Sequence, residues 1–421
     1  MSSSFQAPKG VSEYLPPRAE VLRTIRDAFA EQARLAGYGY LELAVFEDTQ
    51  LFKRGVGEST DVVSKEMYTF EDRGGRSITL RPEFTAGVLR AVLEHGLHKQ
   101  GLPVKVWTTG PAFRAERPQK GRYRQFYQLD LEAIGSQDPQ IDAETIAIAW
   151  NWYQGLGLRQ VRLLLNSLGC RECRPAYRTR LQEFLRGLDL DEATRARVEI
   201  NPLRVLDDKR PEVKAQLTDA PLMADHLCAA CKAHHDKVRS LLADVGIAWT
   251  DEPRLVRGLD YYTRTTYEFE HPLLGAQSGI GGGGRYDGLS EDIGGPPLPG
   301  IGFGLGLDRT LLALEAEGVQ LPVPSRCQVF GVPLGETAEH KVFTLVAELR
   351  RAGIAADMAP AGKSLKSAMK SADRSGAAYA VIIGERDITA GSAQVKDLAT
   401  GEQIAVPLTD LTATLLERIG R

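Results

Sequence analysis

The segment with the densest local charge runs from Arg114 to Arg124, and its residue types suit phosphate binding. Five cations and one carboxylate occupy these eleven residues, and Pro118 and Gly121 turn the chain between two strand-like flanks. A planar guanidinium offers two donors to an oxyanion, and Phe126 on one flank could stack on a base. The pattern predicts a hairpin that grips phosphate, although many basic hairpins are merely solvated turns.

A second candidate site is Leu255–Tyr262, where a cation, a carboxylate and two phenols stand among apolar residues. Its apolar residues would tend to bury the segment, and a buried charge needs a partner or a ligand because an unpaired one costs several kcal/mol. Arg257 therefore either forms a structural pair with Asp260 or belongs to a ligand site. The spacing alone favours neither.

Glycine is in excess, and thirteen glycines fall between Gly275 and Gly306. The stretch Gly279–Gly288 satisfies G-x-G-x-x-G, but four consecutive glycines do so trivially and no βαβ pattern surrounds them. In Gly300–Gly306 every other residue is glycine, which on a strand would leave one face bare for a flat ligand. Arg309 follows, where strand gives way to helix, and could meet a phosphate. Close packing of the strand on the helix would also require glycine.

Two C-x2-C pairs use four of the five cysteines: Cys170, Cys173, Cys228 and Cys231. Their thiolates could hold a structural zinc ion in a closed tetrahedral site. The 54 residues between the pairs exceed the roughly 15 to 20 of compact zinc sites. Reduced core cysteines, which need no metal, are the alternative.

Two further segments carry charge at suggestive spacing. Arg81–Thr85 precedes a helical run, so Glu83 or Thr85 could simply cap that helix. In the last quarter of the chain, four cations follow 3-4-4 spacing, which a helix would gather on one face. They are Lys363, Lys366, Lys370 and Arg374. Most such stripes are solvated, so the spacing alone assigns no function.

The elements that must position these residues indicate an α+β fold. Apolar residues at helical spacing predict an opening helix over Glu20–Ala36, and Gly39–Phe46 is predicted to be extended. Strand-like runs return at Val104–Thr108, Arg124–Ile134, Val161–Asn166 and Thr265–Glu270. With few helices between them, these strands predict an antiparallel sheet flanked by helices.

The texture of the sequence divides the chain. Charged helical stretches replace strand signals between about Cys170 and Asp251, which predicts an inserted helical module. After Pro322 the chain alternates strand and helix, as in a separate α/β domain of about 95 residues. We therefore expect a catalytic core in two parts, residues 1–169 and 253–322. An insertion, residues 170–252, separates the two parts, and a final domain covers residues 326–421.

Composition excludes several classes of protein. The formal net charge of -3 gives no bulk attraction to nucleic acid, so DNA is not an expected partner. Hydrophobic residues at 43% and charged residues at 25% are typical of a globular chain. No apolar leader is present in the first ten residues and no run approaches a membrane span. We expect a cytoplasmic protein without membrane contact.

In this order, the segments resemble the class II aminoacyl-tRNA synthetases, and specifically the bacterial histidyl-tRNA synthetases, over nearly the whole chain. The matching segments are Gly37–Glu47, the basic hairpin and Gly302–Arg309 for the three class signatures, Leu255–Tyr262 and Gly282–Gly288 for stretches of the histidine enzymes, and Arg81–Thr85 for the amino-acid loop. The final domain is similar to the family's anticodon-binding domain.

The resemblance implies a homodimer that activates L-histidine with ATP, taken up with Mg²⁺, releases pyrophosphate, and passes the histidyl group to the 3′ end of tRNA(His). It implies ATP contacts by Arg114, Glu116, Arg122, Phe126 and Arg309. It implies histidine contacts by Glu83, Thr85, Gln128, Glu132, Arg257, Tyr261 and Tyr262. Arg114 and Arg257 are the implied catalytic residues, with Arg257 beside the α-phosphate where related enzymes use a metal ion. Arg117, Gln119 and Arg122 would meet the tRNA acceptor end.

The sequence departs from the family pattern at four positions. Ala44 replaces a proline of the first signature, and Asp308 replaces a glutamate beside Arg309. Phe84 and Tyr127 replace the commoner glycine and histidine. None of these changes removes a phosphate-binding arginine, so activity remains the expectation.

Three other functions are compatible with parts of the sequence. The first is a catalytically silent paralogue, the regulatory subunit of ATP phosphoribosyltransferase, which usually lacks the end domain and parts of the histidine segments. The second is a class II synthetase for another amino acid, which Leu255–Tyr262 disfavours. The third is a zinc-binding nucleic-acid module, suggested only by the cysteine pairs.

Overall fold

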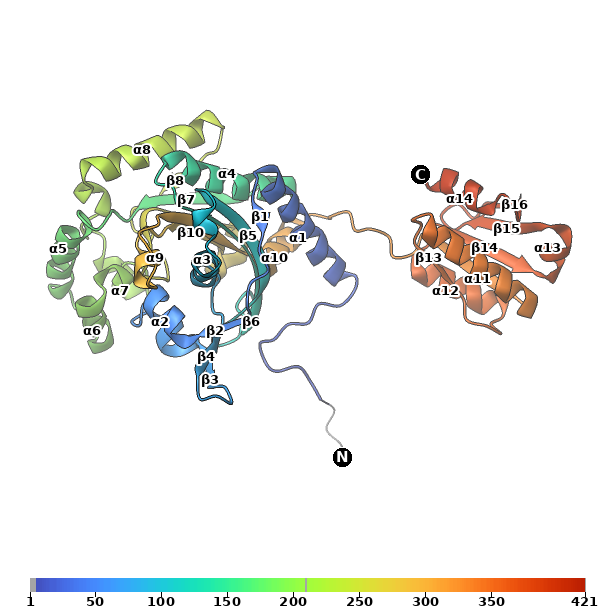
Figure 1. Cartoon of the computed structure of the whole chain (residues 1–421), viewed down its shortest axis with the longest axis horizontal. Coiled ribbons are helices and arrows are strands. Elements are labelled where there is room, and N and C mark those ends of the chain that lie inside the picture. Colours follow the sequence, from blue (N-terminus) through green and yellow to red (C-terminus); the bar gives the residue numbers. More distant parts are fainter. Residues whose placement is uncertain (1–4, 209, 421) are drawn as a thin grey trace. The chain divides into compact units, whose positions relative to one another are not determined.

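The computed structural model describes residues 5–208 and 210–420. The first four residues lie outside that range. They belong to the ten-residue stretch in which we expect no apolar leader. The chain divides into two compact units, Met1–Pro322 and Val323–Arg421 (Figure 1). None of the described helices combines the length and the apolar character that a membrane crossing requires.

An eight-stranded sheet forms the centre of the first unit. Its order is β1 (Gly39–Tyr40), β5 (Val104–Phe113), β6 (Gln125–Ile134), β11 (Gly300–Gly306), β10 (Gly279–Arg285), β9 (Thr263–Glu270), β7 (Arg162–Ser167) and β8 (Thr250–Asp251). The six inner strands are antiparallel to one another, and the two short edge strands pair in parallel with β5 and β7. The antiparallel sheet predicted from the sequence is confirmed.

One face of this sheet is covered by α1 (Arg18–Leu35), α4 (Pro139–Gly155) and α10 (Leu307–Glu317). The apolar face predicted for the opening helix is confirmed, because Leu22, Ile25, Phe29 and Ala33 are buried. On β11, the residues between the glycines are Ile301, Phe303 and Leu305, which join the same core. The glycines therefore face the opposite side of the sheet, because side chains alternate along a strand.

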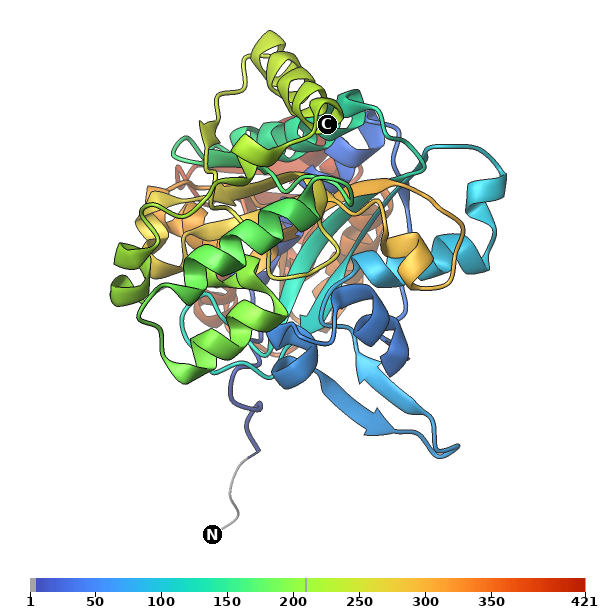
Figure 2. The ribbon, with the colours of Figure 1, turned by 90° about the vertical axis from the view of Figure 1, so that its left-hand side faces the viewer.

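The stretch Gly39–Phe46 is not one strand, contrary to the sequence-based expectation. Its first two residues form β1, and its last residue begins β2 (Phe46–Asp48), which belongs to a second sheet with β3 (Tyr68–Glu71) and β4 (Ser77–Leu80). Between them, the carbonyls of Leu43 and Ala44 accept hydrogen bonds from the guanidinium of Arg81. These carbonyls pair with a side chain instead of a strand. Figure 2 shows β3 and β4 as a light-blue arm that projects from the central sheet.

The other face of the central sheet, on which the glycines of β11 lie, carries α2 (Thr49–Val56), α3 (Thr85–Glu94) and α9 (Leu289–Asp292). Between β7 and β8 the chain forms α5 (Arg174–Arg186), α6 (Glu192–Ile200), α7 (Pro211–Gln216) and α8 (Ala229–Asp244). Helix α8 contributes Cys231 to the core of this helical stretch and Val238 and Leu242 to the core of the sheet.

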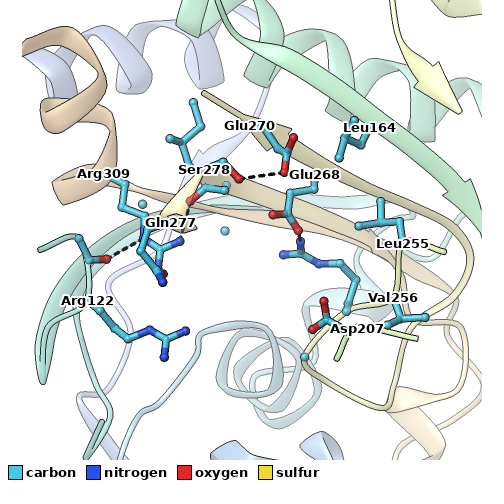
Figure 3. Close-up of a pocket in the computed structure, with 18 of the residues that line it drawn as sticks. Arg122, Leu164, Asp207, Leu255, Val256, Glu268, Glu270, Gln277, Ser278 and Arg309 are labelled. Atoms are coloured by element: carbon cyan, nitrogen blue, oxygen red, sulfur yellow. Dashed lines mark hydrogen bonds and ion pairs between the residues drawn. The ribbon is translucent and has the colours of Figure 1, made fainter. Parts of the chain in front are cut away.

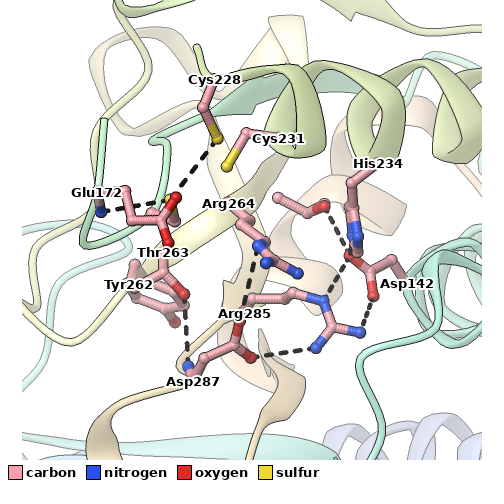
Figure 4. A network of polar contacts seen from close by, with 12 residues as sticks. Asp142, Glu172, Cys228, Cys231, His234, Tyr262, Thr263, Arg264, Arg285 and Asp287 are labelled. Atoms are coloured by element: carbon pink, nitrogen blue, oxygen red, sulfur yellow. Dashed lines mark hydrogen bonds and ion pairs between the residues drawn. The ribbon is translucent and has the colours of Figure 1, made fainter. Parts of the chain in front are cut away.

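A buried ionic network joins α8 to the sheet (Figure 4). The carboxylate of Asp142 on α4 pairs with the guanidinium of Arg285 on β10 at 2.6 Å, and both side chains are fully buried. His234 of α8 and Thr265 of β9 contact the same carboxylate at 2.7 and 2.6 Å. Breaking one partner of such a network leaves a buried charge uncompensated, so these contacts fix α8 firmly to the sheet.

The second unit contains a five-stranded sheet in the order β13 (Ala356–Met358), β12 (Val329–Leu334), β14 (Tyr379–Gly384), β15 (Ser392–Asp397) and β16 (Gln403–Pro407). Its helices are α11 (Glu336–Arg351), α12 (Leu365–Ser375), α13 (Glu385–Ala390) and α14 (Leu411–Ile419). Strands β13, β12 and β14 run in parallel. The alternation of strand and helix predicted here is confirmed.

Candidate active site

A cavity of about 860 Å³ lies over the glycine-bearing face of the central sheet. All five predicted ATP-binding residues line it: Arg114, Glu116, Arg122, Phe126 and Arg309. Figure 3 shows Arg122 and Arg309 on one side of the cavity and Glu268 on the other. The fold therefore brings together cations that are almost 200 residues apart in the sequence.

The basic hairpin connects β5 and β6. Arg114 donates from Nε to the carbonyl of Pro82 at 3.0 Å, and its guanidinium lies 5.2 Å from the ring centroid of Phe126. Arg122 pairs with Glu116 at 2.8 Å. Because Nε holds Arg114 in place, its Nη groups are oriented to donate to an anion in the cavity.

Arg309 is held by the chain segments around it. Its Nε donates to the carbonyl of Gly121 in the hairpin turn at 2.8 Å, and its Nη1 donates to the carbonyl of Gly279 at 2.6 Å. Burial lowers its pKa, yet a guanidinium remains charged in proteins. Arg309 is thus a fixed cation at the junction of β11 and α10.

Arg257 does not pair with Asp260, so the structural pair considered above is not formed. Its Nη1 donates to Glu268 of β9 at 2.5 Å. Burial lowers the pKa of Arg257, but Glu268, Tyr262 and Tyr261 together outweigh burial, so that the pKa is raised. The Asp260 carboxylate accepts hydrogen bonds from Asn201 at 2.9 Å and from Ser59 at 3.1 Å. Arg257 and Glu268 both line the cavity.

Two buried carboxylates lie beside the cavity. Glu83 accepts hydrogen bonds from the first two amides of α3, at 2.9 and 3.0 Å, so it does cap that helix. Its carboxylate also accepts a bond from the hydroxyl of Tyr261 at 3.3 Å. Glu132 accepts bonds from Thr85 at 2.7 Å and from Tyr286 at 2.6 Å. A helix cap and a polar pocket thus share the same side chains.

Burial raises the pKa of each acid in this group. It raises the pKa of Glu132 to about 8, and it raises the pKa of Glu83. For Asp130 the pKa lies well above the ordinary value because of burial and the neighbouring acids Glu132 and Glu83. The nearby cations Arg81 and Arg114 lower the pKa of Asp130 but do not offset burial, so a positively charged ligand would stabilise the ionised acids. Such perturbed acids beside a cavity are typical of a functional site.

The predicted histidine-binding residues divide into two groups. Gln128 and Arg257 line the cavity. Glu83, Thr85, Glu132, Tyr261 and Tyr262 are buried beside it and are connected by the hydrogen bonds above and by the two phenol rings, whose centroids are 4.6 Å apart.

The bare floor of the site requires glycine. A Cβ atom at Gly304 would lie 2.6 Å from Gln128 and 2.8 Å from Asp130, and one at Gly282 would lie 2.8 Å from Arg257. These distances are far below van der Waals contact. The strands β10 and β11 therefore bring backbone, and no side chains, to the centre of the site.

Sequence analysis missed three polar residues of this region. Asp130 lies between Gln128 and Glu132 on the same face of β6, a spacing of two that could have indicated it. Glu268 partners Arg257, and Tyr286 binds Glu132 across the sheet. Nothing local in the sequence marks these two contacts, because each depends on strand register.

Of the predicted tRNA contacts, Arg117 and Gln119 are exposed on the hairpin turn and do not line the described cavity, whereas Arg122 does. Gln119 and Arg122 pair through their backbones, with N–O distances of 3.0 and 2.9 Å. The turn is thus ordered by its own hydrogen bonds while it presents cations to solvent.

The four departures have clear surroundings. Asp308 accepts hydrogen bonds from the hydroxyl of Tyr14 and from the amide of Tyr127, so it ties the hairpin strand to α10. The guanidinium carbon of Arg81 lies 4.2 Å from the ring centroid of Phe84. The carbonyl of Ala44 accepts a hydrogen bond from the same guanidinium. Asp308 and Tyr127 line the cavity, whereas Phe84 and Ala44 are not among the residues that line it.

The two cysteine pairs come together at the start of α5 and α8. Their four sulfur atoms all lie within 4.8 Å of one another, and three of the separations are 3.7, 3.9 and 3.9 Å. Four sulfurs about 2.3 Å from a tetrahedral zinc ion would be about 3.8 Å apart. Backbone amides donate to Cys170 and Cys173 at 3.4 and 3.2 Å. The donor set fits zinc.

Comparisons with known proteins identify the family. A histidyl-tRNA synthetase family model matches residues 10–310, and an anticodon binding domain matches residues 328–418. The chain is 62% identical to the histidine–tRNA ligase of Saccharopolyspora erythraea over 417 residues, which is 99% of each chain. It is 59% identical to that of Streptomyces coelicolor over 419 residues, again 99% of each.

Solved structures of histidyl-tRNA synthetases resemble this chain as well. The apo histidyl-tRNA synthetase of S. aureus superposes with a TM-score of 0.84 at 35% identity, over 98% of this chain and 100% of that one. A Bacillus halodurans protein described as an ATP phosphoribosyltransferase regulatory subunit/histidyl-tRNA synthetase shares the fold, with a TM-score of 0.67 at 21% identity over 91% of this chain and 99% of that one. This chain belongs to the histidyl-tRNA synthetase family, whose members ligate histidine to tRNA using ATP.

Proposed function

We propose that the ligase reaction proceeds in two steps over the glycine floor. In the first, an oxygen of the histidine carboxylate attacks the α-phosphorus of ATP, the bond to the bridging oxygen breaks, and pyrophosphate leaves. In the second, a ribose hydroxyl at the 3′ end of tRNA(His) attacks the histidyl carbonyl and AMP leaves. The observation that carries this proposal is the position of Arg257, which lines the same cavity as Arg114 and Arg309 and is held there by Glu268.

The cations divide the triphosphate between them in this proposal. Arg114 holds the α-phosphate, Arg309 binds the far end of ATP, and Phe126 stacks on adenine. Glu116 and Arg122 complete the ATP site, where their mutual ion pair fixes their side chains. Mg²⁺ enters as part of the substrate, and Arg257 is a second fixed cation of the chain at the α-phosphate. A fixed cation stabilises a transition state in which charge gathers on phosphorus.

The buried acids recognise the amino acid. Glu83 receives the α-ammonium group, and Glu132 with Tyr261 and Tyr262 receives the imidazole nitrogens. Thr85 and Gln128 complete the pocket. An imidazole donates or accepts at each ring nitrogen, so a carboxyl and a phenol match it better than an apolar pocket would.

Amino-acid-dependent ATP–pyrophosphate exchange across a panel of amino acids tests this function. Exchange with histidine alone is the expected result. Silence with every amino acid would instead favour the regulatory subunit of ATP phosphoribosyltransferase, and exchange with another amino acid would overturn the pocket assignment.

We also propose that the chain is a cytoplasmic homodimer. Exposed apolar side chains support this on and beside the small sheet: Tyr40, Val45, Phe46 and Phe70 are 51%, 38%, 56% and 46% exposed. A dimer interface over these elements would remove the four side chains from water. We place the tRNA acceptor end at Arg117, Gln119 and Arg122, where cations and an amide project from the hairpin.

The cations of α12 are proposed to hold the tRNA backbone. Lys366, Lys370 and Arg374 are exposed on this helix, while Lys363 precedes it by two residues. Replacing the three helical cations with alanine should raise the KM for tRNA about tenfold or more, since each phosphate contact adds to affinity, and should leave pyrophosphate exchange unchanged. Steady-state aminoacylation measures both.

The matched control removes three exposed cations elsewhere in the same unit, Lys341, Arg351 and Arg418. An equal rise in KM for tRNA in the control, or an equal loss of exchange in the α12 variant, would count against a specific role for α12.

We propose a structural zinc ion at Cys170, Cys173, Cys228 and Cys231. Protein purified without chelator should contain about one zinc per chain by elemental analysis. Cys228→Ser should lose the metal and lower the midpoint of thermal unfolding, because a closed thiolate site contributes to folding free energy. Cys327→Ser is the control, since the fifth cysteine lies in the other unit, and it should keep the zinc. Much less than one zinc per wild-type chain would sink the assignment.

A further inference from the structure

The guanidinium of Arg174 connects the cysteine cluster to the twin-tyrosine segment. Arg174 follows Cys173 directly and is the first residue of α5. Its Nη2 donates to the backbone carbonyl of Tyr262 at 2.5 Å, and its Nε donates to the carbonyl of Leu168 at 3.1 Å. One planar side chain thus fixes two carbonyls that are 94 residues apart in the sequence.

The chain near Tyr262 needs such support. Two residues later, Arg264 has φ of +46°, the one positive φ outside glycine among the described residues. A left-handed conformation costs a non-glycine residue roughly 1–2 kcal/mol and persists only where its surroundings determine it. The surroundings here are again the segment before the first cysteine: Arg264 donates to the carbonyl of Gly169 at 2.8 Å and accepts from the amide of Leu168 at 2.7 Å.

The other end of the twin-tyrosine segment is held separately. Arg204, from the short helix Pro202–Val205 in the same helical stretch, donates to the carbonyl of Gly258 at 2.6 Å. Asn201 holds the Asp260 carboxylate. Arg174 therefore acts at the tyrosine end of the segment, where the hydroxyl of Tyr261 donates to Glu83. Arg204 acts at the other end, near Arg257.

We propose that Arg174 is a positioning residue that sets the affinity of the enzyme for histidine. It touches no substrate and acts through the Tyr262 carbonyl, which orients both phenols of the pocket. Without the guanidinium, this carbonyl loses its charged donor and the segment can relax away from Glu83. The proposal rests on the histidine pocket assigned under the proposed function.

The test compares Arg174→Ala with Arg180→Ala, an exposed arginine on the same helix. Equilibrium dialysis with labelled histidine gives the dissociation constant without any need for catalysis, and pyrophosphate exchange gives KM for histidine and for ATP. For Arg174→Ala we expect the dissociation constant and KM for histidine to rise tenfold or more, with KM for ATP within twofold. Arg174→Lys, which keeps the charge and one donor, should recover part of the loss.

Two results would overturn the proposal. One is histidine affinity in Arg174→Ala equal to that of Arg180→Ala. The other is an equal loss of histidine and ATP affinity together with loss of zinc, which would show that Arg174 only supports the cysteine cluster. If Arg174→Ala does not fold, the same comparisons apply to Arg174→Lys. Failure of the proposed function is separate, because wild-type protein would then show no histidine-dependent exchange.

Discussion

Replacing Arg257 with alanine should slow histidine-dependent ATP–pyrophosphate exchange by about 10²- to 10³-fold, the usual cost of removing one preorganised donor from a charged transition state. Arg257 is held by Glu268 at 2.5 Å and lines the same cavity as Arg114 and Arg309. The loss should fall on kcat more than on KM, because the cation matters most when charge gathers at the α-phosphate. Pre-steady-state formation of the adenylate measures this step directly.

The control is Arg162→Ala, which removes an exposed cation from β7 of the same sheet and should leave exchange unchanged. Arg257→Lys should recover only part of the rate, because a lysine cannot reproduce the planar guanidinium. If Arg257→Ala kept exchange within about tenfold of wild type, a loss of only about 1.4 kcal/mol, the assigned role would be wrong.

Glu132→Gln should weaken the use of histidine and stabilise the protein at the same time. A buried polar group left without its hydrogen-bond partner costs about 1–3 kcal/mol, so kcat/KM for histidine should fall about 10- to 100-fold. Burial raises the pKa of Glu132 to about 8, so the folded state holds a proton that the unfolded state has released. The free energy of unfolding therefore falls as pH rises from about 4.5 to about 8 and is level outside that window.

The variant lacks this titration, so its stability relative to wild type should increase between pH 5 and pH 8, to a few kcal/mol at the upper end. Denaturant unfolding of both proteins at pH 5, 6.5 and 8 measures the difference. Gln128→Ala is the control, since it trims the same face of β6 without removing an ionisable group. A pH-independent difference between Glu132→Gln and wild type would contradict the raised pKa.

The features that sequence analysis predicted are those with a local signature. The hairpin needs only its turn residues and cations, and the floor needs only glycine at every other position of β11. The Arg257–Glu268 pair could not be foreseen, because the register of β9 against its neighbours decides which acid reaches the arginine. The cysteine pairs also required the fold, since the packing of α5 and α8 closes the distance that their separation in sequence leaves open.

At Gly39–Phe46 the sequence predicted more strand than the structure contains. Its apolar and aromatic residues suit a strand, but two of its carbonyls accept hydrogen bonds from the Arg81 guanidinium. Strand propensity does not decide by itself whether a segment joins a sheet. Here the middle of the segment bonds to the side chain of Arg81, and only its two ends pair with strands.

The glycine floor has a consequence for discrimination between nucleotides. Its amides and carbonyls already bond to each other in the ladder between β10 and β11. The surface therefore offers a ligand no hydrogen-bond donors or acceptors, and it selects only for a flat ring. Any planar ring of similar size would lie on it equally well. The choice of adenine over another purine must therefore be made at the rim, by groups that read the edge of the base.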